Sequence, residues 1–301
     1  EGLMVRQYKI HTNLDGTDDK IWDVTNGKVR FYQPSNLGLQ STNNIWQSNG
    51  IGVMGTRSIT QPQIEFKLET FGESLEENYQ LIKDFVNDIL NQKFVTLEYQ
   101  TEIFQVYADL ALTDVTKTEG YGKNGTFSEK ITFDIITKWY TYENLTFDMI
   151  QNGKVLSGKS KIYGGTAQGN YKYVKGTSYT YYGESDIDRL SRWDIKDEIF
   201  SFMGILYPQL PKTPAGIRFL DDIGNEYTAI VFKTEQVQNY ILINTDVNDE
   251  IYQGWNGTTS LNLFPVMDFE RYRTRIIKKG QMELINLSKA EFKIKRKADF
   301  V

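Results

Sequence analysis

The fold is indicated most clearly by residues 64–99, IEFKLETFGESLEENYQLIKDFVNDILNQKFVTLEY. Apolar and charged side chains alternate over the first part, which predicts a half-buried strand over 63–70. The middle part opens with Ser74-Leu75-Glu76-Glu77, a capping box in which the serine accepts a hydrogen bond and the glutamate reaches back. The last part, 94–99, is β-branched and aromatic and predicts a second strand.

The helix that begins at Ser74 is predicted to bury one apolar stripe. Its apolar residues fall three and four positions apart, with charged residues on the opposite side. The stripe consists of Leu75, Tyr79, Ile82, Val86, Ile89 and Leu90. Asn91-Gln92-Lys93 is expected to end the helix.

Outside this stretch the pattern is that of a β protein. Further strands are predicted over 28–33, 103–110, 127–135, 217–221, 227–232, 240–244, 282–287 and 290–295. Many short strands joined by turns favour β-sandwiches. A length of 301 residues suits about two domains. We therefore expect a mainly β (α+β) protein.

Residues 34–61 form a long polar segment in which Trp46 and Ile51 are isolated apolar residues. Such a segment inside a compact domain is either disordered or a projecting hairpin that packs on a partner. We favour the hairpin, and we expect Trp46 and Ile51 to lie in an interface.

Residues 153–185 are rich in Tyr, Gly, Ser and Thr and poor in aliphatic residues. Tyrosine-rich segments of this kind are typical of recognition loops, because tyrosine offers a large contact area at low entropic cost. An antiparallel hairpin with aromatic cross-strand pairs is the alternative, and both interpretations hold if the hairpin protrudes. The candidate anchors are Tyr163, Tyr171, Tyr173, Tyr179, Tyr181 and Tyr182.

Composition argues against most catalytic classes. The chain has no cysteine and one histidine, His11, so it offers no thiolate nucleophile and no multi-histidine metal site. We expect His11 to be a half-exposed surface residue. The net charge of −5 argues against broad nucleic-acid binding, and no apolar run approaches the roughly 18 residues of a membrane span. We expect Met4 to be the natural start.

Three short motifs carry weaker signals. Gly120–Gly125 has the spacing of a dinucleotide fingerprint, but a strand follows where a helix is required, so a hairpin turn is favoured. The acidic runs Asp15–Asp19 and Asp246–Glu250 lack the spacing of a calcium loop and are expected to be solvated turns. No pair of carboxylates is singled out for glycoside hydrolysis. We therefore expect no catalytic residue, no metal and no cofactor.

Four segments resemble a known family, the distal tail proteins of siphophages that infect Gram-positive bacteria. They are MVRQYKI (4–10), TFGE (70–73), ITFDIITKWY (131–140) and LFPVMDFERY (263–272). The resemblance is closest to the lactococcal type and extends over 4–301. It carries over no catalytic residue, because the family is structural.

The resemblance implies a virion protein that forms a homo-hexameric ring at the distal tip of the tail, after synthesis in the host cytoplasm. Residues 4–140 would be the ring-forming domain, a β-sandwich with a helix and a projecting hairpin. Residues 141–301 would be a galectin-like β-sandwich whose extension, about 145–200, is an arm. The implied partners are receptor-binding protein trimers, the tail tube protein and a tail-associated tip protein.

A second hypothesis comes from a different functional class. Exposed tyrosine and tryptophan also suit sugar stacking, so a carbohydrate-binding module or a glycan-degrading tail enzyme is the alternative. A galectin-like fold raises that possibility by analogy only. Oligomeric state and glycan binding discriminate between the two hypotheses.

Overall fold

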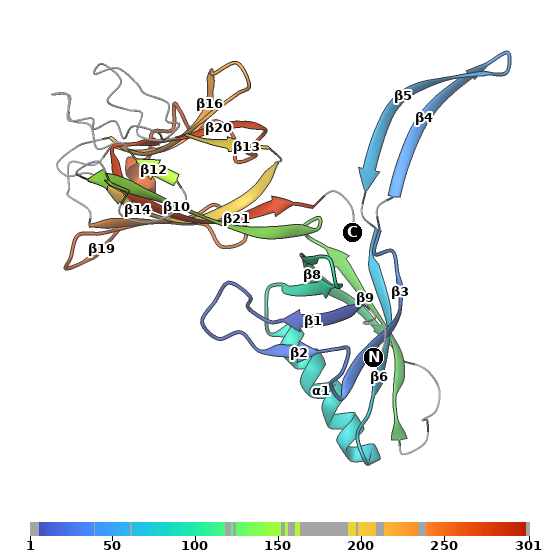
Figure 1. Cartoon of the computed structure of the whole chain (residues 1–301). Helices are drawn as coiled ribbons and strands as arrows, with labels where there is room; N and C mark the ends of the chain where they lie inside the picture. The colour runs from blue at the N-terminus through green and yellow to red at the C-terminus, as the bar shows by residue number, and fades with distance from the viewer. Residues whose placement is uncertain are drawn as a thin grey trace. The chain divides into compact units, whose positions relative to one another are not determined.

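Figure 1 shows the computed structural model of the chain. The protein is mainly β, with a single α-helix among the residues that the structure describes. It divides into two compact units: an N-terminal unit of residues 1–141 with 298–301, and a C-terminal unit of residues 142–297. The described residues are 6–38, 40–60, 62–117, 122, 125–151, 154–155, 160–162, 192–196, 198–208, 214–233 and 239–298.

The N-terminal unit is built on one continuous antiparallel sheet. Its strands lie in the order β2 (Ile21–Asp23), β1 (Gln7–His11), β7 (Val95–Gln100), β8 (Gln105–Thr116), β9 (Ser128–Ile135), β6 (Ile64–Thr70) and β3 (Val29–Ser35). The sheet curls, so that Tyr8 of β1 packs edge-on against Phe66 of β6 with ring centroids 5.4 Å apart. The curled sheet forms two layers. Because each strand is hydrogen-bonded to the next, these layers are two halves of one folded sheet.

The helix α1 (Leu75–Leu90) confirms the predicted helix and its capping box. The hydroxyl of Ser74 accepts a hydrogen bond from the Glu77 N–H at 3.2 Å. The Glu77 carboxylate reaches back and accepts a hydrogen bond from the N–H of Glu73 at 2.7 Å. The helix packs on the sheet through Phe85, whose ring lies edge-on to Trp22 of β2 at 5.2 Å.

The predicted buried stripe of α1 is partly wrong. The buried side chains of the helix are Asn78, Phe85 and Ile89. Three members of the predicted stripe are exposed: Leu75, Tyr79 and Leu90. The first helical turn faces the polar 72–74 turn, where the side chain of Asn78 is bonded to the backbone. The side of the helix that packs on the sheet therefore does not include Leu75 and Tyr79.

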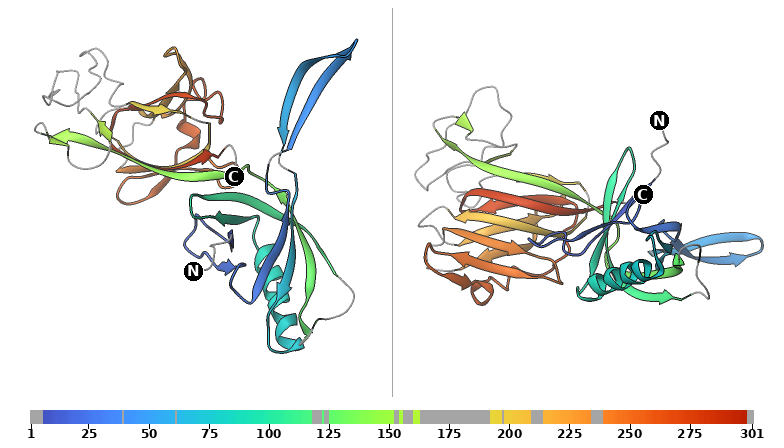
Figure 2. Two further views of the ribbon diagram at one scale, coloured as in Figure 1. Left: turned by 45° about the vertical axis from the view of Figure 1, so that its right-hand side comes forward. Right: turned by 90° about the horizontal axis from the view of Figure 1, so that it is seen from below.

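The C-terminal unit consists of two antiparallel sheets that face each other (Figure 2). One sheet has the order β19 (Ser260–Asn262), β18 (Ile251–Trp255), β17 (Tyr240–Asn244), β14 (Ile199–Pro208), β21 (Leu287–Lys297) and β10 (Tyr140–Gln151). The other has the order β13 (Arg192–Ile195), β20 (Gly280–Ile285), β15 (Ala215–Leu220) and β16 (Glu226–Phe232). The short strands β11 (Lys154–Val155) and β12 (Ser160–Ile162) lie beside β10.

The core of the C-terminal unit lies between these sheets. Phe202 of β14 meets Phe219 of β15 with ring centroids 6.0 Å apart. Phe292 of β21 packs edge-on against Phe202 and Phe147. Burying several such aromatic side chains, each contributing roughly 1.5–3 kcal/mol, provides the main stabilisation of this unit. The strands predicted over 217–221 and 227–232 are confirmed, and they pair with each other as the hairpin β15–β16.

The range 145–200, expected to form an arm, begins and ends in core strands. Leu145, Phe147 and Ile199 are buried between the sheets, so these ends do not belong to a projecting arm. The rest of the expected arm, residues 163–191 between β12 and β13, lies outside the described residues. Its candidate anchors lie outside the described residues: Tyr163, Tyr171, Tyr173, Tyr179, Tyr181 and Tyr182.

Candidate interaction surfaces

The polar segment predicted to form a hairpin does so, as β4 (Gln40–Ser48) and β5 (Ile51–Thr60). The hairpin extends away from the sheet of the N-terminal unit (Figure 1). Asn49 and Gly50 form its two-residue turn with φ of +50° and +79°. Asn-Gly is the dipeptide that favours this type of turn, because both positions require positive φ. This signal could have placed the turn from the sequence.

Both faces of the hairpin carry exposed apolar side chains. Trp46 is 69% exposed and Ile51 is 70% exposed. Trp46 pairs with Val53, and Ile45 pairs with Met54. Successive residues of a strand point to opposite faces. Trp46, Val53 and Ile51 therefore share one face, while Ile45 and Met54 share the other.

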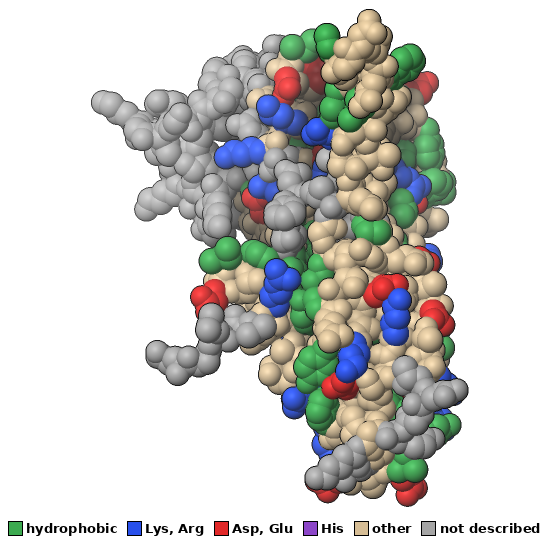
Figure 3. Space-filling view, turned by 90° about the vertical axis from the view of Figure 1, so that its right-hand side faces the viewer, with side chains coloured by type: hydrophobic (Ala, Val, Ile, Leu, Met, Phe, Trp, Pro, Cys, Tyr) green, Lys and Arg blue, Asp and Glu red, His purple; other side chains and the backbone are tan. Residues whose placement is uncertain are grey.

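The apolar surface of the hairpin is larger than the sequence suggested. Val53, Ile45 and Met54 are exposed as well as Trp46 and Ile51. Figure 3 views the molecule from the right-hand side of Figure 1. Few charged side chains appear along the hairpin in this view. Neighbouring exposed apolar side chains are a feature of interaction surfaces, which makes the hairpin a candidate for one.

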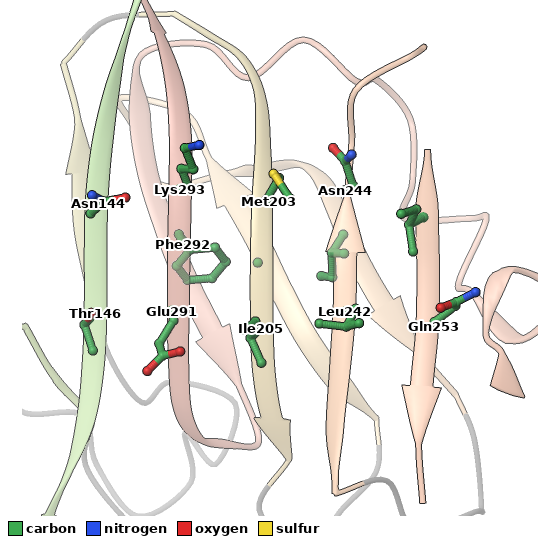
Figure 4. Close-up of a pocket in the computed structure, with 13 residues that line it drawn as sticks. Asn144, Thr146, Met203, Ile205, Leu242, Asn244, Gln253, Glu291, Phe292 and Lys293 are labelled. Carbon is green, nitrogen blue, oxygen red and sulfur yellow. The ribbon is translucent and has the colours of Figure 1, made fainter. Parts of the chain in front are cut away.

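A second surface is a groove of about 470 Å³ on the outer face of the larger C-terminal sheet. It crosses β10, β21, β14, β17 and β18, whose side chains point into it side by side (Figure 4). Met203, Ile205 and Leu242 supply an apolar floor. This groove is not apparent from the sequence, because its lining comes from strands that are distant in the sequence.

The edges of the groove are polar. Amide side chains are provided by Asn144, Asn244 and Gln253, and charges by Glu291 and Lys293. Amide, carboxylate and ammonium groups donate and accept hydrogen bonds in several directions. An apolar floor between such groups can hold a peptide segment or a saccharide.

His11 is buried, so the expectation of a half-exposed residue is wrong. Its Nδ1 lies 2.6 Å from Oδ2 of Asp19, and its Nε2 lies 2.8 Å from Oε2 of Glu98. Burial opposes the charged imidazolium, but the hydrogen bonds to Glu98 and Asp19 outweigh it and raise the pKa of His11. Conversely, the hydrogen bond from His11 lowers the pKa of Glu98 to about 2.

Carboxylates of both acidic runs are bonded to other residues of this chain. Asp19 of the first run turns inward to His11. In the second run, the Asp246 carboxylate accepts from the N–H of Asn248 at 2.9 Å and pairs with Lys295 at 3.0 Å. Within the part of the chain that the structure describes, no group of three or more His, Asp or Glu side chains is placed to hold a metal ion.

The strands on either side of the glycine motif, β8 and β9, pair antiparallel, as predicted for a hairpin. Of the motif itself, Gly122 and Gly125 are among the described residues. Gly125 has a φ of +72°, and its N–H donates to the carbonyl of Gly122 at 3.1 Å. A dinucleotide site would need a helix here.

Among the described residues, no helix has the length and hydrophobicity needed to cross a membrane.

Two family models together match almost the whole chain. Residues 7–136 match the N-terminal domain of the distal tail protein, and residues 138–301 match the C-terminal domain of Dit. The distal tail protein of Lactococcus phage p2 is 94% identical over 298 residues, which are 99% of this chain and 100% of that protein. The distal tail protein of Lactococcus phage SK1 is 91% identical with the same coverage.

Solved structures agree with these relatives. A chain in the phage p2 baseplate, in its activated conformation with Ca, superposes with a TM-score of 0.78 at 94% identity and covers 99% of this chain and 100% of its own. The Dit protein of phage SPP1 shares 11% identity with a TM-score of 0.54, covering 96% of this chain and 98% of its own, which shows similarity of fold. The chain belongs to the distal tail protein family, a family of structural phage proteins.

Proposed function

We propose that this chain forms a homo-hexameric ring at the distal tip of a phage tail, where it joins the tail tube to the baseplate and holds receptor-binding protein trimers. Membership of the distal tail protein family supports the position in the tail. The p2 relative is part of a baseplate, which supports assembly with other baseplate proteins. The N-terminal unit is the proposed ring former, and the C-terminal unit the proposed galectin-like outward part.

The ring proposal rests on the exposed apolar side chains of the hairpin β4–β5. Its exposed apolar side chains lie on both faces and extend away from the sheet of their own unit. Exposing them to water costs roughly 25 cal/mol per Å² relative to burial. A second copy of the chain that covers Trp46 and Ile51 would remove this cost. Because contacts between a hairpin and a different surface are head-to-tail, they can close into a ring.

Electron microscopy and light scattering of the purified full chain test the ring. We expect a hexameric ring for the unmodified protein and loss of assembly for the double variant Trp46→Ser/Ile51→Ser. Ile103→Ser is the matched control, because Ile103 is 88% exposed in the same unit outside the hairpin. A protein that stays monomeric at micromolar concentration and several salt levels would contradict the proposal.

The proposed arm holds the receptor-binding subunit through tyrosine anchors. Truncating an anchor in a partner's pocket typically costs about 2 kcal/mol or more. Replacing Tyr179, Tyr181 and Tyr182 together by serine should therefore weaken binding of the trimer by tens of fold or more, because the effects of neighbouring anchors are not additive. Co-purification measures the complex, and ring assembly should survive. Normal trimer binding by a ring without 163–185 would refute the arm.

Carbohydrate binding remains a second candidate, because the groove combines an apolar floor with polar edges. The corresponding site would be the row from Asn144 to Gln253 across the sheet. Calorimetric titration with host cell-wall saccharides tests it, with the double variant Asn244→Ala/Gln253→Ala for comparison. Binding that the variant abolishes would support this candidate, and the absence of heat at millimolar saccharide would reject it.

A further inference from the structure

His11 joins two separate parts of the N-terminal unit through its two ring nitrogens. Asp19 belongs to the loop between β1 and β2, and Glu98 belongs to β7. Neutral imidazole has one N–H and one lone pair. At 2.6 Å and 2.8 Å both nitrogens lie at hydrogen-bond distance from a carboxylate oxygen. Both contacts are favourable only when each nitrogen carries a proton, which makes the ring an imidazolium.

The groups around His11 match that charge. On β1, Lys9 pairs with the second oxygen of Glu98 at 3.1 Å. On β8, Gln105 is hydrogen-bonded to Glu98, and Tyr107 lies edge-on to the imidazole with ring centroids 6.4 Å apart. With His11 protonated, two positive charges face two carboxylates. Loss of the imidazole proton leaves a net negative charge in a buried cluster, which is costly.

The loop at residues 12–20 depends on Asp19 for its own shape. The other oxygen of Asp19 accepts a hydrogen bond from the N–H of Asn13 at 3.0 Å. Thr12 and Lys20 close the loop through a backbone hydrogen bond of 3.1 Å. Asp19 therefore links the closed loop to the sheet through His11. The edge strand β2 starts directly after this loop and holds α1 through Trp22, whose Nε1 donates to Asp88 at 2.9 Å.

We propose that His11 is a proton-dependent clasp that holds the 12–20 loop against β1 and β7 and releases it when the imidazole loses its proton. Above the pH at which His11 loses its proton, one ring nitrogen presents a lone pair to a carboxylate oxygen. One of the two hydrogen bonds of His11 is then lost. Asp19 is more exposed than Glu98, so the contact with Asp19 opens first. The loop then leaves the sheet while Glu98 keeps its pair with Lys9.

The sequence makes the clasp directly measurable, because His11 is its only histidine. Labelling the full chain with [13Cε1]-histidine gives a single NMR resonance whose titration reports this site. We expect its midpoint to lie above the ordinary value of 6.5. Asp19→Asn should lower the midpoint, whereas Asp18→Asn, a change at the exposed neighbouring residue, should move it less.

Hydrogen exchange of the 12–20 peptide, corrected for the intrinsic effect of pH, reports the loop. We expect protection to fall about tenfold or more as pH rises through the midpoint, since a charged hydrogen bond is lost. In His11→Gln the protection should no longer change over this pH range. A wild-type midpoint at or below 6.5 would overturn the proposal without any variant. Equal protection on both sides of the wild-type midpoint would also overturn it.

Discussion

The side chain of Asn78 is hydrogen-bonded twice to Gly72, six residues earlier in the chain. Its Oδ1 accepts from the Gly72 N–H at 2.7 Å, and its Nδ2 donates to the Gly72 carbonyl at 3.3 Å. The same amide donates to the carbonyl of Ser74 at 2.9 Å, and the side chain is fully buried. One asparagine inside α1 therefore fixes the turn that leads from β6 into the helix.

Asn78→Ala should destabilise the N-terminal unit by about 1–2 kcal/mol, because it leaves the part-buried N–H and carbonyl of Gly72 without their side-chain partner. The higher helix propensity of alanine offsets only a few tenths of a kcal/mol. Urea unfolding measures the change. Asn87→Ala on the exposed side of the same helix is the control, and it should be neutral or slightly stabilising. Equal effects of the two changes would show that the turn does not depend on Asn78.

The start and end of α1 were predictable because capping and periodicity are local properties. Which side of the helix is buried was less predictable. Leu75 and Tyr79 fit the apolar stripe, yet the buried residue in the first turn is Asn78. A polar side chain that satisfies backbone groups six residues away looks, in sequence, like an ordinary surface residue. The exposed Leu75 and Tyr79 show that periodicity does not determine which apolar residues the core uses.

The candidate sites were predictable to different extents. Trp46 and Ile51 stood out because their surroundings are polar, and the structure places both on the exposed hairpin. The burial of His11 and its pairing with Glu98 were not predicted, because this contact joins residues 87 positions apart. Strand β7 is buried on both faces, so Glu98 is buried although sequence alternation would leave a glutamate in solvent.

The free energy of unfolding should depend on pH through the His11 cluster. Glu98 has its pKa lowered to about 2 from 4.5, so its contribution is present above 4.5 and is lost as pH falls toward 2. His11 has a raised pKa, so its contribution is complete below 6.5 and is lost as pH rises through the folded-state value. The cluster therefore stabilises most between about 4.5 and 6.5.

Denaturant unfolding of the wild type and His11→Gln at a series of pH values tests this window. The difference in unfolding free energy between the two proteins should be largest inside the window and decrease on both sides. Taking the difference cancels the titration of carboxylates elsewhere in the chain. A difference that stays constant from pH 3 to pH 9 would contradict the coupling.

Arg218, which is partly exposed, pairs with the buried Glu283 in the smaller C-terminal sheet. Nε and Nη2 of Arg218 both lie 2.8 Å from Oε2 of Glu283, whose side chain is fully buried. Arg218→Met should cost about 3–5 kcal/mol, because it leaves a buried carboxylate without its cation. Arg218→Met/Glu283→Leu should recover much of this loss. A double-mutant cycle by chemical unfolding measures the coupling, and additive effects would show that the pair is not coupled.

Gly50 couples local backbone geometry to the proposed ring. Its φ of +79° lies in the left-handed region, where a residue with a side chain costs about 1–2 kcal/mol. Gly50→Val should therefore distort the Asn49-Gly50 turn and misalign Trp46 with Val53. The described side chains of β4 are all exposed and outside the core, so the melting temperature of the monomer should change little. Ring assembly should weaken.

Gly38→Val is the control, because a Cβ at Gly38 meets nothing within 4 Å. Analytical ultracentrifugation measures assembly, and calorimetry measures melting. If Gly50→Val assembles as well as Gly38→Val, the geometry of the hairpin tip is not needed for the ring.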